Sequence, residues 1–223
     1  MWAVIPIKNL NETKHRLKSA LNPQERRDFF VEMFEDVLTT LLAVPELEQV
    51  AVATVCPIAG KIAKKYGTSV LFTEKDEGQT AAVTRTAEIL ESKRVAKMLM
   101  LPGDVPLVTV EEIQTVIATH ENACSTPDVP AMTIVPARDE QGSNCIVLSP
   151  PTAAPLRFGP NSYFPHLETA RKLGVSLQTL KLPGIGLDID TPEDLLELGR
   201  QTVQTRAQNY LQKYKILERI KIA

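Results

Sequence analysis

The sequence predicts an α/β fold, in which a mostly parallel sheet lies between two layers of helices in a Rossmann-like arrangement. Over most of the 223 residues, short β-branched runs alternate with segments of helical periodicity, the order typical of parallel strands joined by crossover helices. The run Ala96–Leu101 is almost wholly apolar, as in a strand buried on both faces. Because no linker, repeat or low-complexity tract interrupts this order, we expect one domain over residues 1–198, with 199–223 as a basic helical extension of it.

Local signals place each predicted element. The predicted strands, in order, are Trp2–Ile7, Gln49–Cys56, Ser69–Thr73, Ala96–Leu101, Ala131–Ala137, Cys145–Ser149 and Val175–Leu182. The first helix begins at Asn22-Pro23-Gln24-Glu25, which combines a capping Asn, a Pro at the first helical position and a Glu at the third. The later predicted helices are Pro57–Tyr66, Gln79–Ser92, one capped by Thr109, Tyr163–Leu173, and a long C-terminal helix that begins at Thr191. The segment from Gly199 onward could continue this helix, pack on the body of the domain or reach a partner subunit.

Composition excludes several classes of protein. Hydrophobic residues make up 43% and charged residues 23%, which is ordinary globular usage and argues against wholesale disorder. The net charge of −2 argues against a dedicated nucleic-acid binder, although residues 199–223 hold six Lys or Arg against one Glu and the rest of the chain is acidic. The three Cys lie far apart without a CxxC pair, and no apolar run approaches the ~18 residues of a membrane span. We therefore expect a cytoplasmic protein that binds neither nucleic acid nor membrane.

The common phosphate-binding and hydrolase motifs are missing from the sequence. It contains no GxGxxG, no GxxxxGK[ST], no GxSxG and no HExxH, and its three His are scattered. Phosphate chemistry in this chain would therefore use side-chain cations and a metal held by carboxylates.

Three cations follow the first predicted strand, where a parallel sheet usually opens its binding site. These are Lys8, Lys14 and Arg16, in the stretch Pro6-Ile7-Lys8 to Lys14-His15-Arg16. They could form a solvated basic loop or a clamp on a polyphosphate, for which Arg offers bidentate geometry and Lys a point charge.

Acidic residues stand at two further places of this kind. Asp104 follows the apolar strand in Gly103-Asp104-Val105-Pro106, where it could form a turn or bind a hard metal such as Mg²⁺. Asp188 and Asp190 lie on one side of an extended segment, and two adjacent carboxylates are favourable when a cation lies between them. For Asp190 alone, a second reading is that it complements the dipole of the following helix.

Two loops rich in small and hydroxyl residues remain, Gly142-Ser143-Asn144 and Phe158-Gly159-Pro160-Asn161-Ser162. Each could be an ordinary turn with a helix cap. Alternatively, backbone N–H groups beside a Ser hydroxyl could hold an anion.

Taken together, these motifs resemble the 2-phospho-L-lactate guanylyltransferase family, which includes phosphoenolpyruvate and 3-phospho-D-glycerate variants and acts in coenzyme F(420) biosynthesis. The resemblance runs in the family's order from Trp2 to about Gly199, and its most specific parts are Phe158-Gly159-Pro160-Asn161-Ser162 and Asp188-Ile189-Asp190-Thr191-Pro192. It implies a nucleotidyltransferase fold of the nucleotide-diphospho-sugar transferase type. It also implies transfer of GMP from GTP to a small phosphorylated carboxylic acid, with Mg²⁺ as cofactor and release of pyrophosphate.

The resemblance also implies roles for individual residues. The implied catalytic residues are Lys8, Lys14, Arg16 and Asp104, and the implied metal ligands are Asp104, Asp188 and Asp190. GTP would be bound by Pro6, Lys8, Gly78, Thr80, Gly103 and Asp104, and the acceptor by Ser143, Asn144, Gly159 and Ser162. The chain departs from the family where Gln79-Thr80 replaces Leu-Asn, Ser143 replaces Thr, and His15 replaces a small residue.

The expected partners are GTP and the phosphorylated acid. A homodimer and a hand-off of the unstable product to the next enzyme of the pathway stay open. Two rival functions also stay open: a nucleotidyltransferase that acts on a sugar phosphate or molybdopterin, and a non-catalytic nucleotide-binding protein of the same fold.

Overall fold

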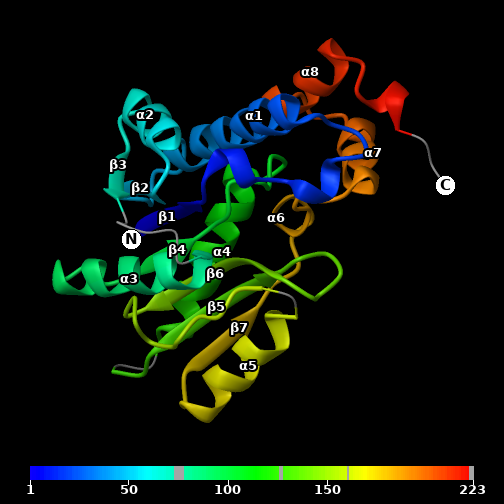
Figure 1. Ribbon diagram of the computed structural model, residues 1–223. Helices are drawn as coiled ribbons and strands as arrows, with labels where there is room; N and C mark the ends of the chain where they lie inside the picture. Colours follow the sequence, from blue (N-terminus) through cyan, green and yellow to red (C-terminus); the bar gives the residue numbers. More distant parts are fainter. Residues whose placement is uncertain (73–77, 126–127, 160, 221–223) are drawn as a thin grey trace.

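A computed structural model describes residues 1–72, 78–125, 128–159 and 161–220 (Figure 1). In these residues a seven-stranded sheet has the order β3-β2-β1-β4-β6-β5-β7. The strands are β1 (Trp2–Ile7), β2 (Gln49–Thr54), β3 (Ser69–Phe72), β4 (Met98–Met100), β5 (Ala131–Pro136), β6 (Ser143–Ser149) and β7 (Ser176–Thr179). Only β6 is antiparallel to its neighbours, β4 and β5, so the predicted mostly parallel α/β sheet is confirmed. The predicted end of the third strand at Thr73 lies outside the described residues.

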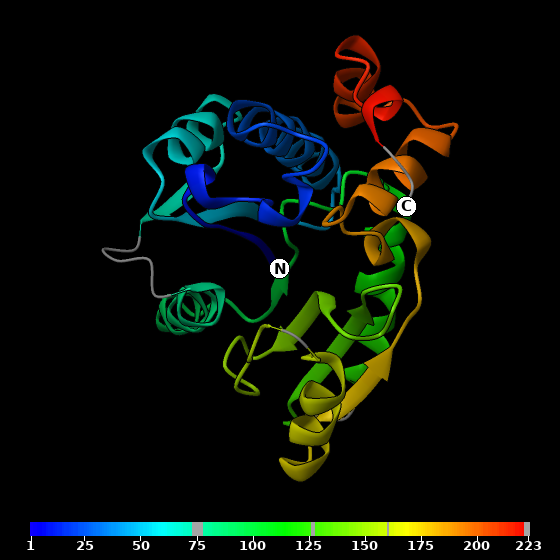
Figure 2. The same ribbon diagram turned by 45° about the vertical axis from the view of Figure 1, so that its right-hand side comes forward.

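Eight α-helices and three short 3₁₀ turns surround the sheet in the described ranges. The α-helices are α1 (Pro23–Leu42), α2 (Pro57–Lys65), α3 (Gly78–Ser92), α4 (Val110–Ala123), α5 (Tyr163–Lys172), α6 (Pro183–Gly186), α7 (Pro192–Arg200) and α8 (Arg206–Lys213). The 3₁₀ turns are Leu10–Glu12, His15–Leu17 and Leu217–Arg219. Figure 2 shows α1 and α2 on one side of the first strands and α3 on the other.

Alternation along the strands divides the interior into two cores. Ala3 and Ile5 of β1 point into a core that includes the buried faces of α1, α2 and α4. Val4, between them, points into a second core with α3 and α5. Both faces of the central strands are therefore buried, which explains why β4 is apolar at every position.

The start of α1 follows from its first residues, as predicted. The Asn22 side chain accepts from the backbone N–H of Glu25, and the Glu25 carboxylate accepts from that of Asn22. This capping box satisfies two N–H groups that have no partner within the helix. Phe29, Met33 and Phe34 then point into the core.

The prediction of one long C-terminal helix from Thr191 was wrong. Helix α7 ends at Arg200, and α8 begins after Thr205, which forms a second capping box with Gln208. The Gln208 amide donates to the carbonyls of Leu198 and Gln201 at 2.9 Å each. These bonds satisfy the last carbonyls of α7 and turn the chain back along α1.

Contacts between α8 and α1 hold the C-terminal segment in place. The Asp36 carboxylate of α1 accepts from the backbone N–H groups of Arg206 and Ala207 at 2.9 and 3.0 Å. Arg206 also pairs with Glu35, and Arg219 with Glu25. Positive charge in residues 199–223 is thus matched by acidic side chains of α1.

Two further differences from the predicted elements affect the site. Strand β6 begins at Ser143 rather than Cys145, so Ser143 and Asn144 belong to the strand and not to a loop. The four-residue helix α6, absent from the prediction, follows a β7 that ends at Thr179 rather than Leu182. Among the described residues, no helix combines the length and apolar character that crossing a membrane requires.

We predict that Asn22→Ala lowers the free energy of unfolding by about 1 kcal/mol, because the N–H of Glu25 loses its capping acceptor. Urea unfolding followed by circular dichroism measures this loss. Asn22→Ser keeps an acceptor at the same place and should stay close to the original protein. Equal losses in both variants would contradict the capping role.

Candidate active site

The ammonium group of Lys14 joins three distant parts of the chain. Its Nζ lies 2.5 Å from Oδ2 of Asp104 and 2.7 Å from Oδ1 of Asp190. Asp104 follows β4, Asp190 precedes α7, and Lys14 itself lies in the segment after β1. The Lys14 side chain is only 3% exposed, so this cation is shielded from solvent by the groups that it joins.

The backbone of Lys14 is also unusual, since its φ of 56° places it in the left-handed region. For a residue with a side chain this conformation costs about 1–2 kcal/mol. The two ion pairs offset that cost and fix where the 3₁₀ turn His15–Leu17 begins.

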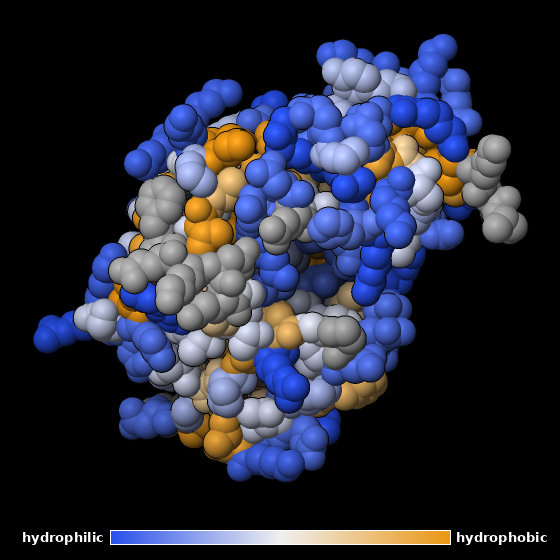
Figure 3. Space-filling view, viewed as in Figure 1, coloured by the Kyte–Doolittle hydropathy of each residue, from blue (hydrophilic) through white to orange (hydrophobic). Residues whose placement is uncertain are grey.

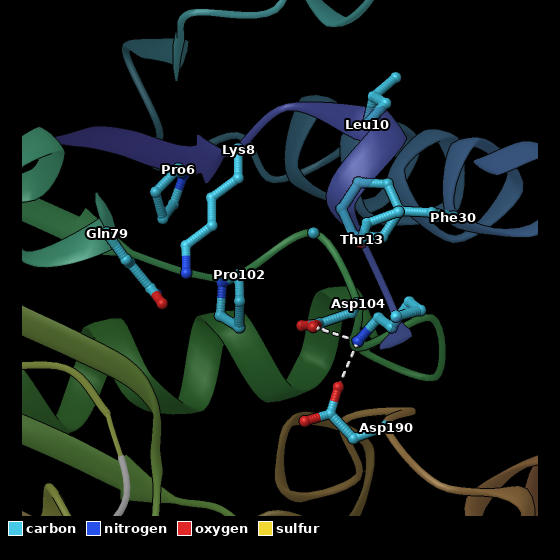
Figure 4. A pocket seen from close by; sticks show the side chains of 11 residues that line it. Pro6, Lys8, Leu10, Thr13, Phe30, Gln79, Pro102, Asp104 and Asp190 are labelled. Carbon is cyan, nitrogen blue, oxygen red and sulfur yellow. Dashed lines mark hydrogen bonds and ion pairs between the residues drawn. The ribbon is translucent and has the colours of Figure 1, made fainter. Parts of the chain in front are cut away.

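A cleft opens at this edge of the sheet and has two connected halves. The β1 half is lined by Pro6, Lys8, Leu10, Thr13, Lys14, Phe30, Gln79, Pro102, Gly103, Asp104 and Asp190 (Figure 4). The β6 half, of about 420 Å³, is lined by Lys8, Arg16, Gln79, Pro102, Asp104, Ala137, Asp139, Gln141, Gly142, Ser143, Asn144, Phe158, Gly159, Ser162, Asp188 and Asp190. Small-molecule sites commonly have this size and concave shape. In the space-filling view the surface is hollowed between hydrophilic side chains (Figure 3).

A buried carboxylate supports the segment that carries Asp188 and Asp190. Glu112 of α4 accepts from the backbone N–H groups of Gly184 and Ile185, at 2.7 and 3.0 Å. A Cβ on Gly184 would lie 2.3 Å from the carbonyl oxygen of Leu107, so only glycine fits there. Leu187 and Ile189 are buried, which turns the alternate residues Asp188 and Asp190 toward the cleft, as predicted.

The pKa values of Asp188 and Asp190 are shifted in opposite directions. Burial and the nearby charge of Asp104 raise the pKa of Asp188 to about 6. Burial also acts to raise the pKa of Asp190, but the charge of Lys14 and its hydrogen bond outweigh burial and hold that pKa below its ordinary value. Burial acts to lower the pKa of Lys14, yet its two carboxylate partners raise it above the ordinary value. Lys14 therefore stays charged. The charged form of Asp188 is destabilised by burial and by Asp104, and a cation bound next to it would stabilise that form.

The donor set of the cleft fits Mg²⁺. Oδ1 of Asp104 is buried and has no hydrogen-bond partner among the described residues. A cation bound beside Asp188 would stabilise the charged form of that carboxylate, which burial disfavours. In the described ranges no three His, Cys, Asp or Glu side chains are grouped so that together they could hold a metal ion, and this applies to Asp104, Asp188 and Asp190. Mg²⁺ commonly takes only one or two carboxylates, with substrate phosphates and water as its other ligands.

Polar side chains of β6 are held from two directions. The Asn144 amide donates to the carbonyl of Ile185 and to Oδ1 of Asp188, at 2.9 and 3.0 Å. Ser143 Oγ lies 3.0 Å from Nδ1 of His166 on α5. Both Ser143 and Asn144 are buried, so their positions in the cleft wall are fixed by packing as well as by hydrogen bonds.

Most residues that the sequence singled out do line the cleft. Those that line it are Pro6, Lys8, Lys14, Arg16, Gly103, Asp104, Ser143, Asn144, Gly159, Ser162, Asp188 and Asp190. Gly78 and Thr80 are not among its lining residues; the Thr80 hydroxyl instead accepts from the backbone N–H of Phe158.

Two placements differ from a simple basic clamp. Lys14 is buried and paired with carboxylates. Arg16 is 71% exposed, and its guanidinium lies 3.8 Å from the Asp190 carboxylate. Gln79 lines both halves, and the sequence reasoning missed it. Its position directly after Gly78, where Gln79-Thr80 replaces the Leu-Asn of the family, is the sequence signal that could have found it.

Comparison with known proteins identifies the family. Residues 1–221 match the profile described as "Guanylyl transferase CofC like". The chain belongs to this family. A phosphoenolpyruvate guanylyltransferase of Conexibacter woesei is 29% identical over 92% of this chain and 89% of its own length. A 3-phospho-D-glycerate guanylyltransferase of Colwellia psychrerythraea is 30% identical over 86% and 88%, and a 2-phospho-L-lactate guanylyltransferase of Methanothermobacter thermautotrophicus is 28% identical over 96% and 90%.

Solved structures show the same fold at lower identity. A candidate nucleotide-diphospho-sugar transferase from Desulfovibrio desulfuricans G20 has a TM-score of 0.78 at 15% identity, over 98% of this chain and 96% of that one. A CMP:2-keto-3-deoxy-manno-octonic acid synthetase, solved with CTP, has a TM-score of 0.59 at 15% identity, over 88% and 95%. The predicted nucleotide-diphospho-sugar transferase type of fold is therefore confirmed. With its family, this CofC-like chain is an enzyme of the nucleotidyltransferase class.

We predict that Asp188→Asn stabilises the protein at pH 8 by on the order of 1 kcal/mol when EDTA is present. The folded state raises this pKa above its unfolded value, so the original protein loses stability as the pH rises from about 4 to about 6 and the variant does not. Urea unfolding at pH 4 and pH 8 measures the difference, which should vanish at pH 4.

Asp190→Asn is the matched control and should have the opposite sign. The folded state lowers the pKa of Asp190, so its carboxylate contributes stability above the unfolded pKa, and the variant loses that contribution at pH 8. Destabilisation by both substitutions would contradict the assignment of Asp188 as the uncompensated carboxylate.

Proposed function

We propose that this CofC-like protein transfers GMP from GTP to a small phosphorylated carboxylic acid and releases pyrophosphate. The candidate acceptors are phosphoenolpyruvate, 3-phospho-D-glycerate and 2-phospho-L-lactate, and the proposed setting is coenzyme F(420) biosynthesis. One observation supports this most: Asp104 and Asp190, joined by Lys14, lie where the two halves of the cleft meet. The reacting groups of two anionic substrates would meet at that point.

The β1 half is the proposed GTP side. Pro6, Gly103 and Pro102 form an uncharged wall beside Lys8, whose ammonium points into the cavity (Figure 4). Lys8 would neutralise the β- and γ-phosphates, which leave as pyrophosphate. Arg16, exposed at the rim of the β6 half, could add a second positive charge when the substrates are bound.

The β6 half is the proposed acceptor side. Ser143, Asn144 and Ser162 are buried polar residues in its wall, and Gly159 also lines it. Gly159 has φ of 135°, a conformation open to glycine that lets the backbone come close to a ligand. The Ser143 and Ser162 hydroxyls suit the carboxylate or phosphate of a small acid, whereas the Asn144 amide already donates to Ile185 and Asp188.

The proposed reaction needs no general base. An acceptor phosphate is already ionised at neutral pH, so one of its oxygens can attack the α-phosphorus of GTP. The bond from that phosphorus to the bridging oxygen breaks, and both electrons leave with pyrophosphate. Among the cleft residues, no His or Cys is needed to move a proton; His166 is buried behind Ser143. The protein's contribution is alignment and charge neutralisation.

Asp104 and Asp188 are the residues that would hold Mg²⁺, while Asp190, the third predicted ligand, pairs with Lys14 and Arg16. When bound, the metal would offset negative charge on the α-phosphate and on the incoming acceptor. Lys14 keeps Asp104 and Asp190 together before any ligand arrives, because it neutralises part of their mutual repulsion. We thus assign Lys14 to the carboxylates rather than to the leaving pyrophosphate.

We expect GTP-dependent release of pyrophosphate only when a phosphorylated carboxylic acid is present. A coupled pyrophosphate assay, with GTP crossed against the three acids and against a sugar phosphate, measures this, and ATP in place of GTP is the control for the base. Release with the sugar phosphate alone, or no release with any acid, would overturn the proposed function.

We expect Asp104→Asn to lower kcat by about 10²–10³-fold, the effect typical of removing one electrostatic contact to a transition state. The fold should persist, since the amide keeps the size of the side chain. Asp28→Asn, at a surface carboxylate of α1, is the matched control and should keep full turnover. Near-normal turnover in Asp104→Asn would exclude this residue from the metal site.

A further inference from the structure

A buried histidine stands directly behind the proposed acceptor side. His166 is 2% exposed, and its ring contacts two polar groups. Nδ1 lies 3.0 Å from Ser143 Oγ, and Nε2 accepts from the backbone N–H of Arg157 at 2.9 Å. The ring of Phe158 packs edge-on against it, with centroids 5.6 Å apart.

These contacts fix the tautomer of the imidazole. A backbone N–H can only donate, so Nε2 must present its lone pair to Arg157. A neutral imidazole carries one hydrogen, which must therefore be on Nδ1. The Nδ1–H group then donates to Ser143 Oγ.

The same contacts decide what the Ser143 hydroxyl can do. With one lone pair occupied by His166, the hydroxyl hydrogen is directed away from the ring, and Ser143 lines the β6 half of the cleft. We propose that His166 is a positioning residue that makes the Ser143 hydroxyl a committed hydrogen-bond donor to an anionic oxygen of the acceptor substrate. This inference rests on the proposed function for the identity of that oxygen.

The arrangement suits a carboxylate or phosphate, because such oxygens carry no hydrogen and can only accept. Burial lowers the pKa of His166 to about 4, so the ring stays neutral over the physiological range. A second proton on Nε2 would also oppose the N–H of Arg157. The acceptor would thus be recognised here by an oriented dipole rather than by a positive charge.

His120 provides an internal comparison. It is fully buried, and burial lowers its pKa to about 4 as well. Its two nitrogens contact the hydroxyls of Thr133 and Ser149, at 3.0 and 2.7 Å. Because hydroxyls can donate or accept, nothing fixes this tautomer, and His120 does not line the cleft.

The first test reads the tautomer without any turnover. Long-range ¹H–¹⁵N spectra of the labelled protein, with His166 assigned by its absence in His166→Asn, should show a neutral Nδ1–H imidazole from pH 5.5 to pH 8. An Nε2–H tautomer, or titration near the ordinary value of about 6.5, would overturn the proposal. This result does not depend on whether the protein transfers GMP.

The second test is a double-mutant cycle in the acceptor assay. His166→Leu should raise the KM for the acceptor about fivefold, the effect of losing one oriented hydrogen bond, while kcat and the KM for GTP change by less than about twofold. Ser143→Ala should raise the acceptor KM at least as much, and His166→Leu should have no further effect in that background.

Two variants separate positioning from general packing. His166→Asn keeps an N–H near the place of Nδ1 and should restore most of the acceptor affinity. His120→Leu removes a histidine of equal burial and should lower stability without changing the acceptor KM. Additive effects of His166→Leu and Ser143→Ala, or failure of His166→Asn to restore affinity, would overturn the positioning role. Lack of turnover with every acid in the original protein would instead count against the proposed function.

Discussion

The ion pairs of Lys14 with Asp104 and Asp190 set the geometry on which the site depends. Asp104 is 90 positions from Lys14 in the sequence, and Asp190 is 176 positions away. Two carboxylates brought this close repel each other, and a buried ammonium between them reduces that repulsion. The segment after β1, the end of β4 and the segment before α7 are therefore held in one arrangement, and both halves of the cleft are built on it.

The basic residues of the C-terminal segment and those of the cleft lie in different parts of the molecule. Residues 199–223 are basic, but Arg206 and Arg219 pair with acidic groups of α1. Lys8 and Arg16 lie instead at the cleft. A net charge of −2 is thus compatible with anionic substrates, because attraction at a site depends on local rather than total charge.

Local patterns were enough for the strands, for the start of α1 and for the edge of the sheet where the carboxylates meet, because each depends on neighbours in the sequence. The break between α7 and α8 was missed although Thr205 and Gln208 have the spacing of a capping box. The residues after Thr191 were interpreted as one continuous helix. Helix α6 has no such signal, since it is held by Glu112 from 72 positions away. The engagement of Lys14 by carboxylates could not be predicted either, because it depends on how three separate loops pack.

The reversed direction of β6 has a consequence for how such enzymes can diversify. Every other described strand of the sheet runs with its carboxyl end toward the edge that holds the cleft, whereas β6 runs the opposite way and lines the cleft with its first residues, Ser143 and Asn144. The connection 137–142 and the start of β6 therefore form one continuous hairpin that carries much of the β6 wall. Under the proposed function, an exchange of this short segment would alter the choice of acceptor and leave the β1 half intact. Selection could then act on one substrate of a two-substrate enzyme independently of the other.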